Sequence, residues 1–262
     1  MRAFLIALQF LTRIPVRLQN TPNAQQVARS QLYYPLVGLL MGVVLILLAW
    51  ILQGVLQDVP TMLRAAIILT AWVLISGGLH LDGLADSADA WAGGLGDREK
   101  TLAIMKDPAC GPAGVVSIVL LLLLKFTALY TLFELEVPAT PSAYNLPLLM
   151  IIIAPMLART IPSLLFLTTP YVRQQGLGSA LVADLPRRGL MLVIAVVIAS
   201  VVLLAGSIGL WLIFAVAVVF VLARRLMIQR IGGVTGDIAG AFIEITEVSV
   251  LISAVLLLSV FY

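Results

Sequence analysis

Three aspartates in residues 77–91 are the first candidates for chemistry. Asp82, Asp86 and Asp89 are spaced i, i+4 and i+7, so on a helix they share one face. Like charges on one face repel, and in an apolar setting they must face water or be neutralised, usually by a divalent cation such as Mg2+. The alternative is that they are solvated or cap a helix at a membrane boundary. The chain's single histidine, His80, lies beside them.

A second acidic stripe lies near the carboxyl end. Asp237, Glu244 and Glu247 occupy positions i, i+7 and i+10 and again share a helical face. Gly236 and Gly240 lie along this stripe and let a backbone or a ligand come close. Two carboxylate stripes that meet at one face are what a two-metal phosphoryl-transfer site needs, because the metals neutralise a bridging phosphate and leave room for an attacking hydroxyl.

Several basic residues are candidates for binding a substrate phosphate: Lys106, Arg159, Arg173 and Arg230. Arg159 and Lys125 fall inside apolar runs, where a charge needs a partner or a wet cavity. A guanidinium suits bidentate recognition of an oxyanion, so we favour phosphate binding for Arg159 and keep pairing with a carboxylate as the alternative. For Lys125 we favour the pairing.

The composition places these residues in a polytopic membrane protein. Of the 262 residues, 61% are hydrophobic and only 11% are charged, whereas about a quarter are charged in soluble proteins. We predict an all-α membrane bundle of about seven transmembrane helices, as one catalytic domain over residues 1–262. The apolar runs that suit these helices are residues 33–52, 61–80, 113–133, 146–167, 190–205, 208–223 and 246–262.

Three local patterns refine this architecture. Residues 190–205 and 208–223 are so close in sequence that we expect a tight hairpin. Gly38 and Gly42 form a small-xxx-small pair that predicts close helix packing. Residues 1–11 suit an amphipathic helix at the membrane interface, although a helix this short can equally pack against the bundle.

The distribution of basic residues predicts the orientation of the chain. Thirteen of the 16 Lys and Arg residues fall on one side of the predicted spans, which the positive-inside rule assigns to the cytoplasm. The amino terminus is then cytoplasmic and the carboxyl terminus outside. Both acidic stripes emerge on the cytoplasmic side, together with residues 92–112, which Pro108 and Gly111 make a shaped loop rather than a helix. A cation transporter would place its acids near the midplane, so acids at span ends favour chemistry at the interface.

The two acidic motifs resemble those of a known family. Residues 78–89, Gly-Leu-His-Leu-Asp-Gly-Leu-Ala-Asp-Ser-Ala-Asp, and residues 232–247 look like the two hallmark motifs of cobalamin synthase, adenosylcobinamide-GDP ribazoletransferase. Residues 29–42, 105–114 and 171–178 also resemble that family. One departure is that Pro-Ala-Cys-Gly follows Asp107, where the family commonly has Ser-Arg-x-Gly.

The resemblance implies the last assembly step of the coenzyme B12 nucleotide loop, at the bacterial inner membrane with the active site facing the cytoplasm. Adenosylcobinamide-GDP and α-ribazole, or its 5'-phosphate, would give adenosylcobalamin, or its phosphate, and GMP in a Mg2+-dependent reaction. We expect contact with the lipid bilayer, no nucleic-acid partner, and leave a homo-oligomer open.

The implied roles divide the candidate residues into two groups. The carboxylates of both stripes would hold Mg2+ against the pyrophosphate, the four basic residues would bind phosphate, and the base would be Asp89 or, second, His80. The nearest rival enzyme is a lipid synthase similar to the CDP-alcohol phosphotransferases. Its Asp-Gly-x2-Ala-Arg element is absent, because Asp86 stands where the arginine would be.

Overall fold

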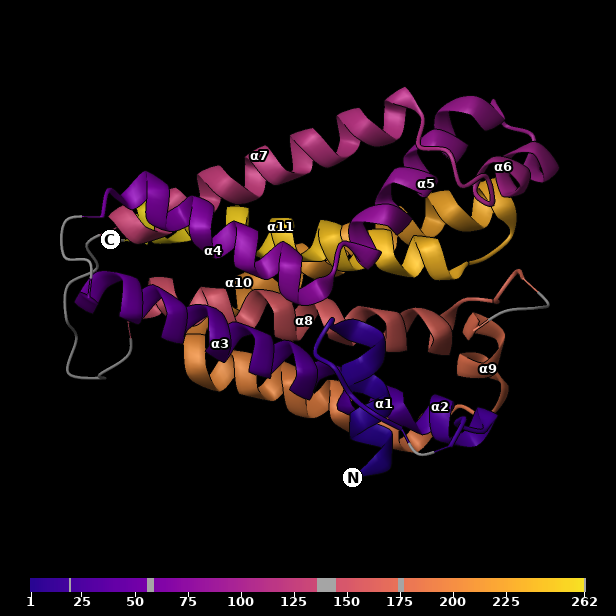
Figure 1. Cartoon of the computed structure of the whole chain (residues 1–262), viewed down its shortest axis with the longest axis horizontal. Coiled ribbons are helices and arrows are strands. Elements are labelled where there is room, and N and C mark those ends of the chain that lie inside the picture. Colours follow the sequence, from indigo (N-terminus) through magenta and orange to yellow (C-terminus); the bar gives the residue numbers. More distant parts are fainter. Residues whose placement is uncertain (19, 56–58, 136–144, 174–176, 262) are drawn as a thin grey trace.

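The chain is an all-helical bundle in the computed structural model, which describes residues 1–18, 20–55, 59–135, 145–173 and 177–261 (Figure 1). The fold class predicted from the sequence is confirmed. One short 3-10 turn, Gln31–Tyr33, precedes α3. The helices are α1 (Arg2–Leu11), α2 (Ala24–Ser30), α3 (Tyr34–Val55), α4 (Thr61–Ser76), α5 (Leu79–Gly94), α6 (Arg98–Ile104), α7 (Pro112–Glu134), α8 (Leu146–Thr168), α9 (Leu177–Ala183), α10 (Arg187–Ile231) and α11 (Gly236–Phe261).

The helices that can cross a membrane agree with the predicted count of about seven. Within the described residues, five helices are long and apolar enough, and α4 joined to α5 makes a sixth that is bent by 86°. The long helix α10 is two helices, because Gly206 has non-helical angles (φ 57, ψ −131). An added Cβ at Gly209 would lie 2.5 Å from the carbonyl oxygen of Val201, so the two halves fold back on each other as the predicted hairpin.

One helix agrees with the predicted acidic stripe, and another differs from the sequence prediction. Helix α11 begins at Gly236, so the predicted helical stripe of Asp237, Glu244 and Glu247 and the apolar run 246–262 form one continuous helix. Helix α6 lies within residues 92–112, which we predicted as a loop. The Asp97 side chain caps α6 by accepting a hydrogen bond from the backbone N–H of Lys100 at 2.8 Å, and this short polar helix has no apolar periodicity to reveal it.

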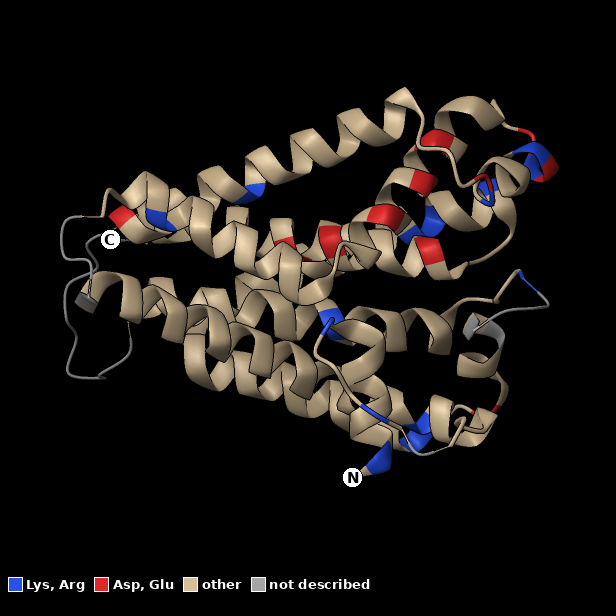
Figure 2. Ribbon diagram, in the orientation of Figure 1, with Lys and Arg blue, Asp and Glu red and all other residues tan. Residues whose placement is uncertain are grey.

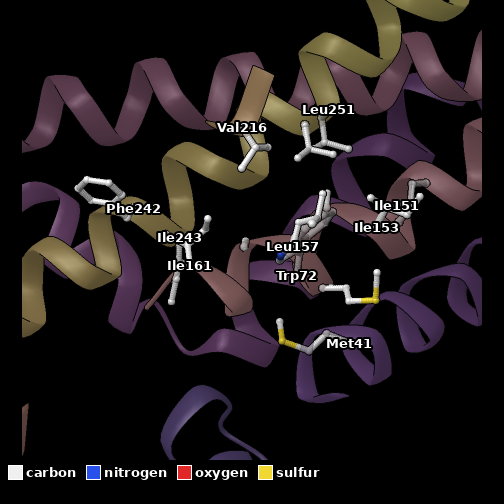
Figure 3. Packing of buried hydrophobic residues seen from close by; sticks show 14 of the residues in the cluster. Met41, Trp72, Ile151, Ile153, Leu157, Ile161, Val216, Phe242, Ile243 and Leu251 are labelled. Atoms are coloured by element: carbon white, nitrogen blue, oxygen red, sulfur yellow. The ribbon is translucent and has the colours of Figure 1, made fainter. Parts of the chain in front are cut away.

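Glycines set the close packing of α3 against α8, as the small-xxx-small pair predicted. An added side chain at Gly38 would overlap the backbone carbonyl of Pro155, and a Cβ at Gly42 would lie 2.6 Å from the Cα of Ile152. Close approach of this kind is how helices associate where lipid removes most of the hydrophobic driving force. Figure 3 shows the neighbouring core, in which Trp72 lies among aliphatic side chains from several helices.

Helix α1 packs against the bundle, which was the alternative to an interfacial position. Leu11 is fully buried, and the rings of Phe10 and Tyr34 stack with their centroids 6.0 Å apart. The rings of Phe4 and Tyr33 meet edge to face at 6.1 Å. The N-terminal segment therefore forms part of one wall of the bundle.

Charged residues gather at one end of the molecule. Figure 2 shows that they concentrate around α5, α6 and the start of α11, whereas the opposite end, where the C-terminus lies, carries few among the described residues. Both acidic stripes begin at the charged end. This end is the place to look for the site.

Candidate functional site

The bend between α4 and α5 turns the first acidic stripe away from the direction of α4. Gly77 and Gly78 both adopt left-handed angles (φ 68 and 71), which cost little only for glycine. Helix α4 ends there, and α5 leaves at an angle of 86°. The aspartates of α5 thus lie past the bend, at the charged end of the bundle.

Helix α5 crosses α11 at two glycines, and this crossing brings the two acidic motifs together. An added Cβ at Gly83 would lie 2.5 Å from the carbonyl oxygen of Asp237, so a side chain there would overlap the backbone of α11. One at Gly240 would lie 3.3 Å from the Cα of His80, which is a tight contact. Asp82, which precedes Gly83, is consequently a neighbour of Asp237, and Figure 2 shows acidic positions of the two helices side by side.

Like charges crowd one another at this crossing. The pKa of Asp86 is raised from its ordinary value of 3.8 to about 6, first by burial and then by the charges of Asp82 and Asp237. Asp89 adds to the rise, and Arg173 opposes it. Asp82 itself is exposed. A cation that neutralised these carboxylates would relieve the repulsion.

Arg173 is held beside Asp237 by a short backbone pairing of two segments distant in sequence. The N–H of Val172 donates to the carbonyl of Val234, and the N–H of Val234 donates to the carbonyl of Pro170, each at 2.9 Å. Arg173 then lies 2.6 Å from the Asp237 carboxylate, with 21% of its side chain exposed. This position, next to the acids and partly exposed, suits the predicted phosphate ligand.

Asp89 caps α7. Its two carboxylate oxygens accept hydrogen bonds from the backbone N–H groups of Gly111, at 2.7 Å, and Gly114, at 2.9 Å. A carboxylate at a helix N-terminus satisfies donors that the helix leaves free. Both oxygens are occupied, so the geometry favours an anchoring role for Asp89, which is the capping alternative, over its predicted roles as base and metal ligand.

Glu244 and Glu247 lie deeper, in a buried network of charges. Lys125 lies 2.8 Å from the carboxylate of Glu244 and 2.5 Å from that of Glu247, and Arg159 pairs with Glu247 as well. The indole N–H of Trp72 donates to Glu247 at 2.9 Å. The four charged side chains are at most 3% exposed. The predicted pairing of Lys125 with a carboxylate is confirmed, and for Arg159 and both glutamates the geometry favours this network over phosphate or metal.

The other basic candidates lie in different surroundings. Arg230 donates to the backbone carbonyl of Trp91 at 2.8 Å and to the Thr101 hydroxyl at 3.2 Å, and its guanidinium lies over the Trp91 ring. Arg230 thus joins α10 to α5 and α6. Lys106, which follows α6, is exposed and can reach a ligand in solvent.

The carboxylates suit Mg2+ in their chemistry but do not form a closed cage. Among the described residues, no three Asp, Glu, His or Cys side chains are grouped closely enough to hold a metal ion by themselves. Mg2+ usually takes one or two protein carboxylates and completes its shell with water and substrate phosphates. Asp82, Asp86 and Asp237 are the carboxylates left for that purpose.

A cavity of about 230 Å3 opens beside these acids. Asp82, Arg173 and Asp237 are among the charged residues that line it. His80 also lines it, is 3% exposed, and has no hydrogen-bond partner for either ring nitrogen. The rest of the lining is mostly apolar and comes from α1, α3, α5, α8, α9 and α11, with Tyr171 from the segment that follows α8.

The sequence did not reveal this cavity. Its walls combine elements from both ends of the chain, including α1 and the short helix α9, and no local pattern links them. Tyr171 is one functional candidate that was missed. Burial raises the pKa of its hydroxyl, which contacts Gly178, and its backbone bridges to Val234. Its place in the motif of residues 171–178 was the only signal.

Comparisons with known proteins agree along almost the whole chain. A family model described as cobalamin-5-phosphate synthase matches residues 3–255. A Pseudomonas fluorescens strain Pf-5 protein named adenosylcobinamide-GDP ribazoletransferase is 51% identical, over 98% of this chain and 100% of its own. A relative with the same name from Pseudomonas putida strain GB-1 is 51% identical over 98% of this chain and 99% of its own length. Another from Stutzerimonas stutzeri strain A1501 is 48% identical over 98% of this chain and 98% of its own length. No solved structure matches the chain.

Proposed function

The chain belongs to the cobalamin-5-phosphate synthase family, and on that premise we propose that it joins adenosylcobinamide-GDP to α-ribazole, or to α-ribazole 5'-phosphate. The products are adenosylcobalamin, or its 5'-phosphate, and GMP. This is the last step of nucleotide-loop assembly. Family membership favours this activity over a lipid synthase or a cation transporter.

The observation that carries the chemistry is the crossing of α5 and α11. Gly83 lies against the backbone of Asp237, so carboxylates from two distant motifs flank one point at the end of the bundle. The raised pKa of Asp86 reflects the same crowding. Repelling carboxylates that face solvent are a natural counterpart for Mg2+ and a pyrophosphate.

In this proposal Asp82, Asp86 and Asp237 hold Mg2+ together with the pyrophosphate of adenosylcobinamide-GDP. Bound Mg2+ would neutralise charge on the transferring phosphate and the leaving GMP. Arg173 pairs with Asp237 at 2.6 Å and donates to the backbone carbonyl of Met105 at 3.2 Å, and we assign its guanidinium to binding phosphate oxygens as well. Lys106 is placed to add a further positive charge from the segment after α6.

The reaction breaks the phosphoanhydride bond of the pyrophosphate and forms a phosphodiester. The attacking group is a free ribose hydroxyl of α-ribazole, and it is not the 5'-hydroxyl, because that oxygen carries the phosphate in α-ribazole 5'-phosphate and keeps it in the product. This hydroxyl oxygen attacks the phosphorus attached to cobinamide, the bond from that phosphorus to the GMP oxygen breaks, and the hydroxyl proton is released to water. Phosphoryl transfer depends mainly on positioning and charge neutralisation and less on a strong base. We therefore assign Asp89 to anchoring α7 rather than to proton transfer.

We place the enzyme in the bacterial inner membrane, with this end of the bundle in the cytoplasm. The basic residues of the loops that flank the site support that orientation through the positive-inside rule. Adenosylcobinamide-GDP and α-ribazole would then reach the acids from the cytosolic side.

The test is turnover by the purified protein in detergent. Adenosylcobinamide-GDP, α-ribazole and Mg2+ are mixed with it, and GMP and the corrinoid product are quantified by chromatography. We expect stoichiometric GMP and adenosylcobalamin, and loss of both with EDTA that excess Mg2+ reverses. Absence of GMP release by a folded, monodisperse protein would refute the activity, and turnover unaffected by EDTA would refute the metal.

A further inference from the structure

The cavity beside the acids has the properties of a binding site that the proposed chemistry does not yet use. Its volume of about 230 Å3 is below the 300–1,000 Å3 typical of sites for drug-sized ligands, so it suits a ring system rather than a whole corrinoid. Its lining combines the acids Asp82 and Asp237 with apolar side chains such as Phe10 and Leu11. A ligand with polar and apolar parts would suit this mixed lining.

Aromatic rings line two parts of the cavity. Phe10 and Tyr34 stack with an interplanar angle of 17°, and Phe166 meets Tyr171 edge to face, with centroids 6.1 Å apart. All four residues line the cavity. Aromatic walls of this kind favour a flat aromatic ligand through stacking and edge contacts.

His80 supplies the polar group within the apolar part. It is 3% exposed, lines the cavity, and neither of its ring nitrogens has a hydrogen-bond partner among the described residues. Buried polar groups without a partner are costly, and they are usually satisfied by protein, water or ligand. An imidazole can donate from one nitrogen and accept at the other, so it can bind a ring nitrogen or a ribose hydroxyl.

We propose that this cavity holds the heterocyclic base of α-ribazole, and that His80 hydrogen-bonds to the bound nucleoside. This inference rests on the proposed function. A benzimidazole base has apolar edges and few polar atoms, which suits these walls. With the base among the aromatic rings, the ribose would lie near Asp82 and Asp237, which line the same cavity, and a free ribose hydroxyl could attack there.

The guanine of the other substrate fits the same cavity poorly. Its edge carries several donors and acceptors, and the apolar walls would leave most of them unpaired, which is unfavourable for each buried group. Corrinoid is excluded by size. The cavity therefore discriminates between the acceptor nucleoside and the parts of adenosylcobinamide-GDP.

The test measures KM for α-ribazole and KM for adenosylcobinamide-GDP separately, with the purified full-length enzyme and Mg2+. His80→Ala is expected to raise KM for α-ribazole about tenfold, equivalent to ~1.4 kcal/mol, and to leave KM for adenosylcobinamide-GDP within about twofold. His80→Gln keeps a donor and an acceptor and should recover part of the affinity. Ser87→Ala, on the same helix but outside the cavity lining, is the control and should match the parent.

A second variant keeps the inference testable if His80→Ala does not fold. Ala239 lines the cavity, and Ala239→Leu would occupy part of it, so it should also raise KM for α-ribazole selectively. A rise in KM for adenosylcobinamide-GDP instead, or a lower kcat with both KM values unchanged, would overturn the subsite. Calorimetry with α-ribazole alone gives an independent readout, and unchanged affinity in folded variants would overturn it too. Failure of the parent to release GMP would instead refute the proposed function.

Discussion

Replacing Lys125 with methionine should reveal how the buried charges are balanced. Lys125 is 1% exposed and lies 2.8 Å from Glu244 and 2.5 Å from Glu247, so its loss leaves two buried carboxylates with Arg159 as their remaining cation. Removing one partner of a buried ion pair usually costs about 3–5 kcal/mol, because the other charge stays buried and uncompensated. Methionine nearly preserves the volume, so the loss reports charge rather than a cavity. We expect a drop in unfolding free energy of that size.

A double-mutant cycle isolates the electrostatic part. Glu244→Gln alone should cost about 1.5–3 kcal/mol, since Lys125 keeps Glu247 and loses one charge-assisted hydrogen bond. Combining it with Lys125→Met returns the network to one positive and one negative charge, so the double variant should be at least ~1 kcal/mol more stable than the sum of the two single effects predicts.

The assay is equilibrium unfolding in mixed micelles, followed by tryptophan fluorescence. Thr127→Ala is the control on the same helix, because its hydroxyl is exposed and bonds only within α7, and it should stay within about 0.5 kcal/mol of the parent. A cost below about 1 kcal/mol for Lys125→Met, or additive effects in the double variant, would refute the reasoning. In Glu244→Gln, the Mg2+ concentration that gives half-maximal activity should equal that of the parent. A tenfold change in this concentration would return Glu244 to the metal site.

The remaining predictions concern the charged end. Gly83→Ala places a Cβ 2.5 Å from the Asp237 carbonyl, so it should lower kcat at least about tenfold and reduce the unfolding free energy by about 1–3 kcal/mol. Gly54→Ala, at a position in open space, is the control and should change neither quantity. A Gly83→Ala enzyme with the kcat of the parent would contradict the close crossing. Asp89→Ala leaves the N–H groups of Gly111 and Gly114 without their acceptor, so it should lower the unfolding free energy by about 1–3 kcal/mol in chemical unfolding. An unchanged unfolding free energy would show that Asp89 does not anchor α7. Because the folded protein holds the Asp86 proton with a pKa of about 6 rather than 3.8, stability in EDTA should fall as the pH rises between those values. Thermal unfolding of Asp86→Asn across that range should lack this decline, and a parent without it would contradict the crowding.

The sequence predicted the helical bundle and the meeting of the two acidic motifs, because apolar length and helical spacing are local properties. Depth was harder to predict. A helix rises 1.5 Å per residue, so Glu244 lies about 10 Å along α11 from Asp237, inside the bundle rather than at its end. Helical spacing placed both residues on one face, but it did not show that Glu244 lies deep enough in the bundle to pair with Lys125 of α7.

Other features depend on contacts that no local pattern encodes. The capping of α7 by Asp89, the pairing of Arg173 with Asp237 and the enclosure of His80 each join segments far apart in the chain. The helical spacing of Asp82, Asp86 and Asp89 suggested one shared role. Tertiary contacts instead give Asp89 a different partner from the other two.

The most direct test of the central claim is Mn2+ binding, measured by electron paramagnetic resonance, with Mn2+ in place of Mg2+ and adenosylcobinamide-GDP present without α-ribazole. If carboxylates of α5 and α11 act on one cation, Asp82→Asn and Asp237→Asn should each weaken Mn2+ binding at least about tenfold, and their effects should be non-additive in the double variant. Asp97→Asn, at the cap of α6, should bind as the parent does. Normal Mn2+ affinity in either Asp82→Asn or Asp237→Asn would contradict the account.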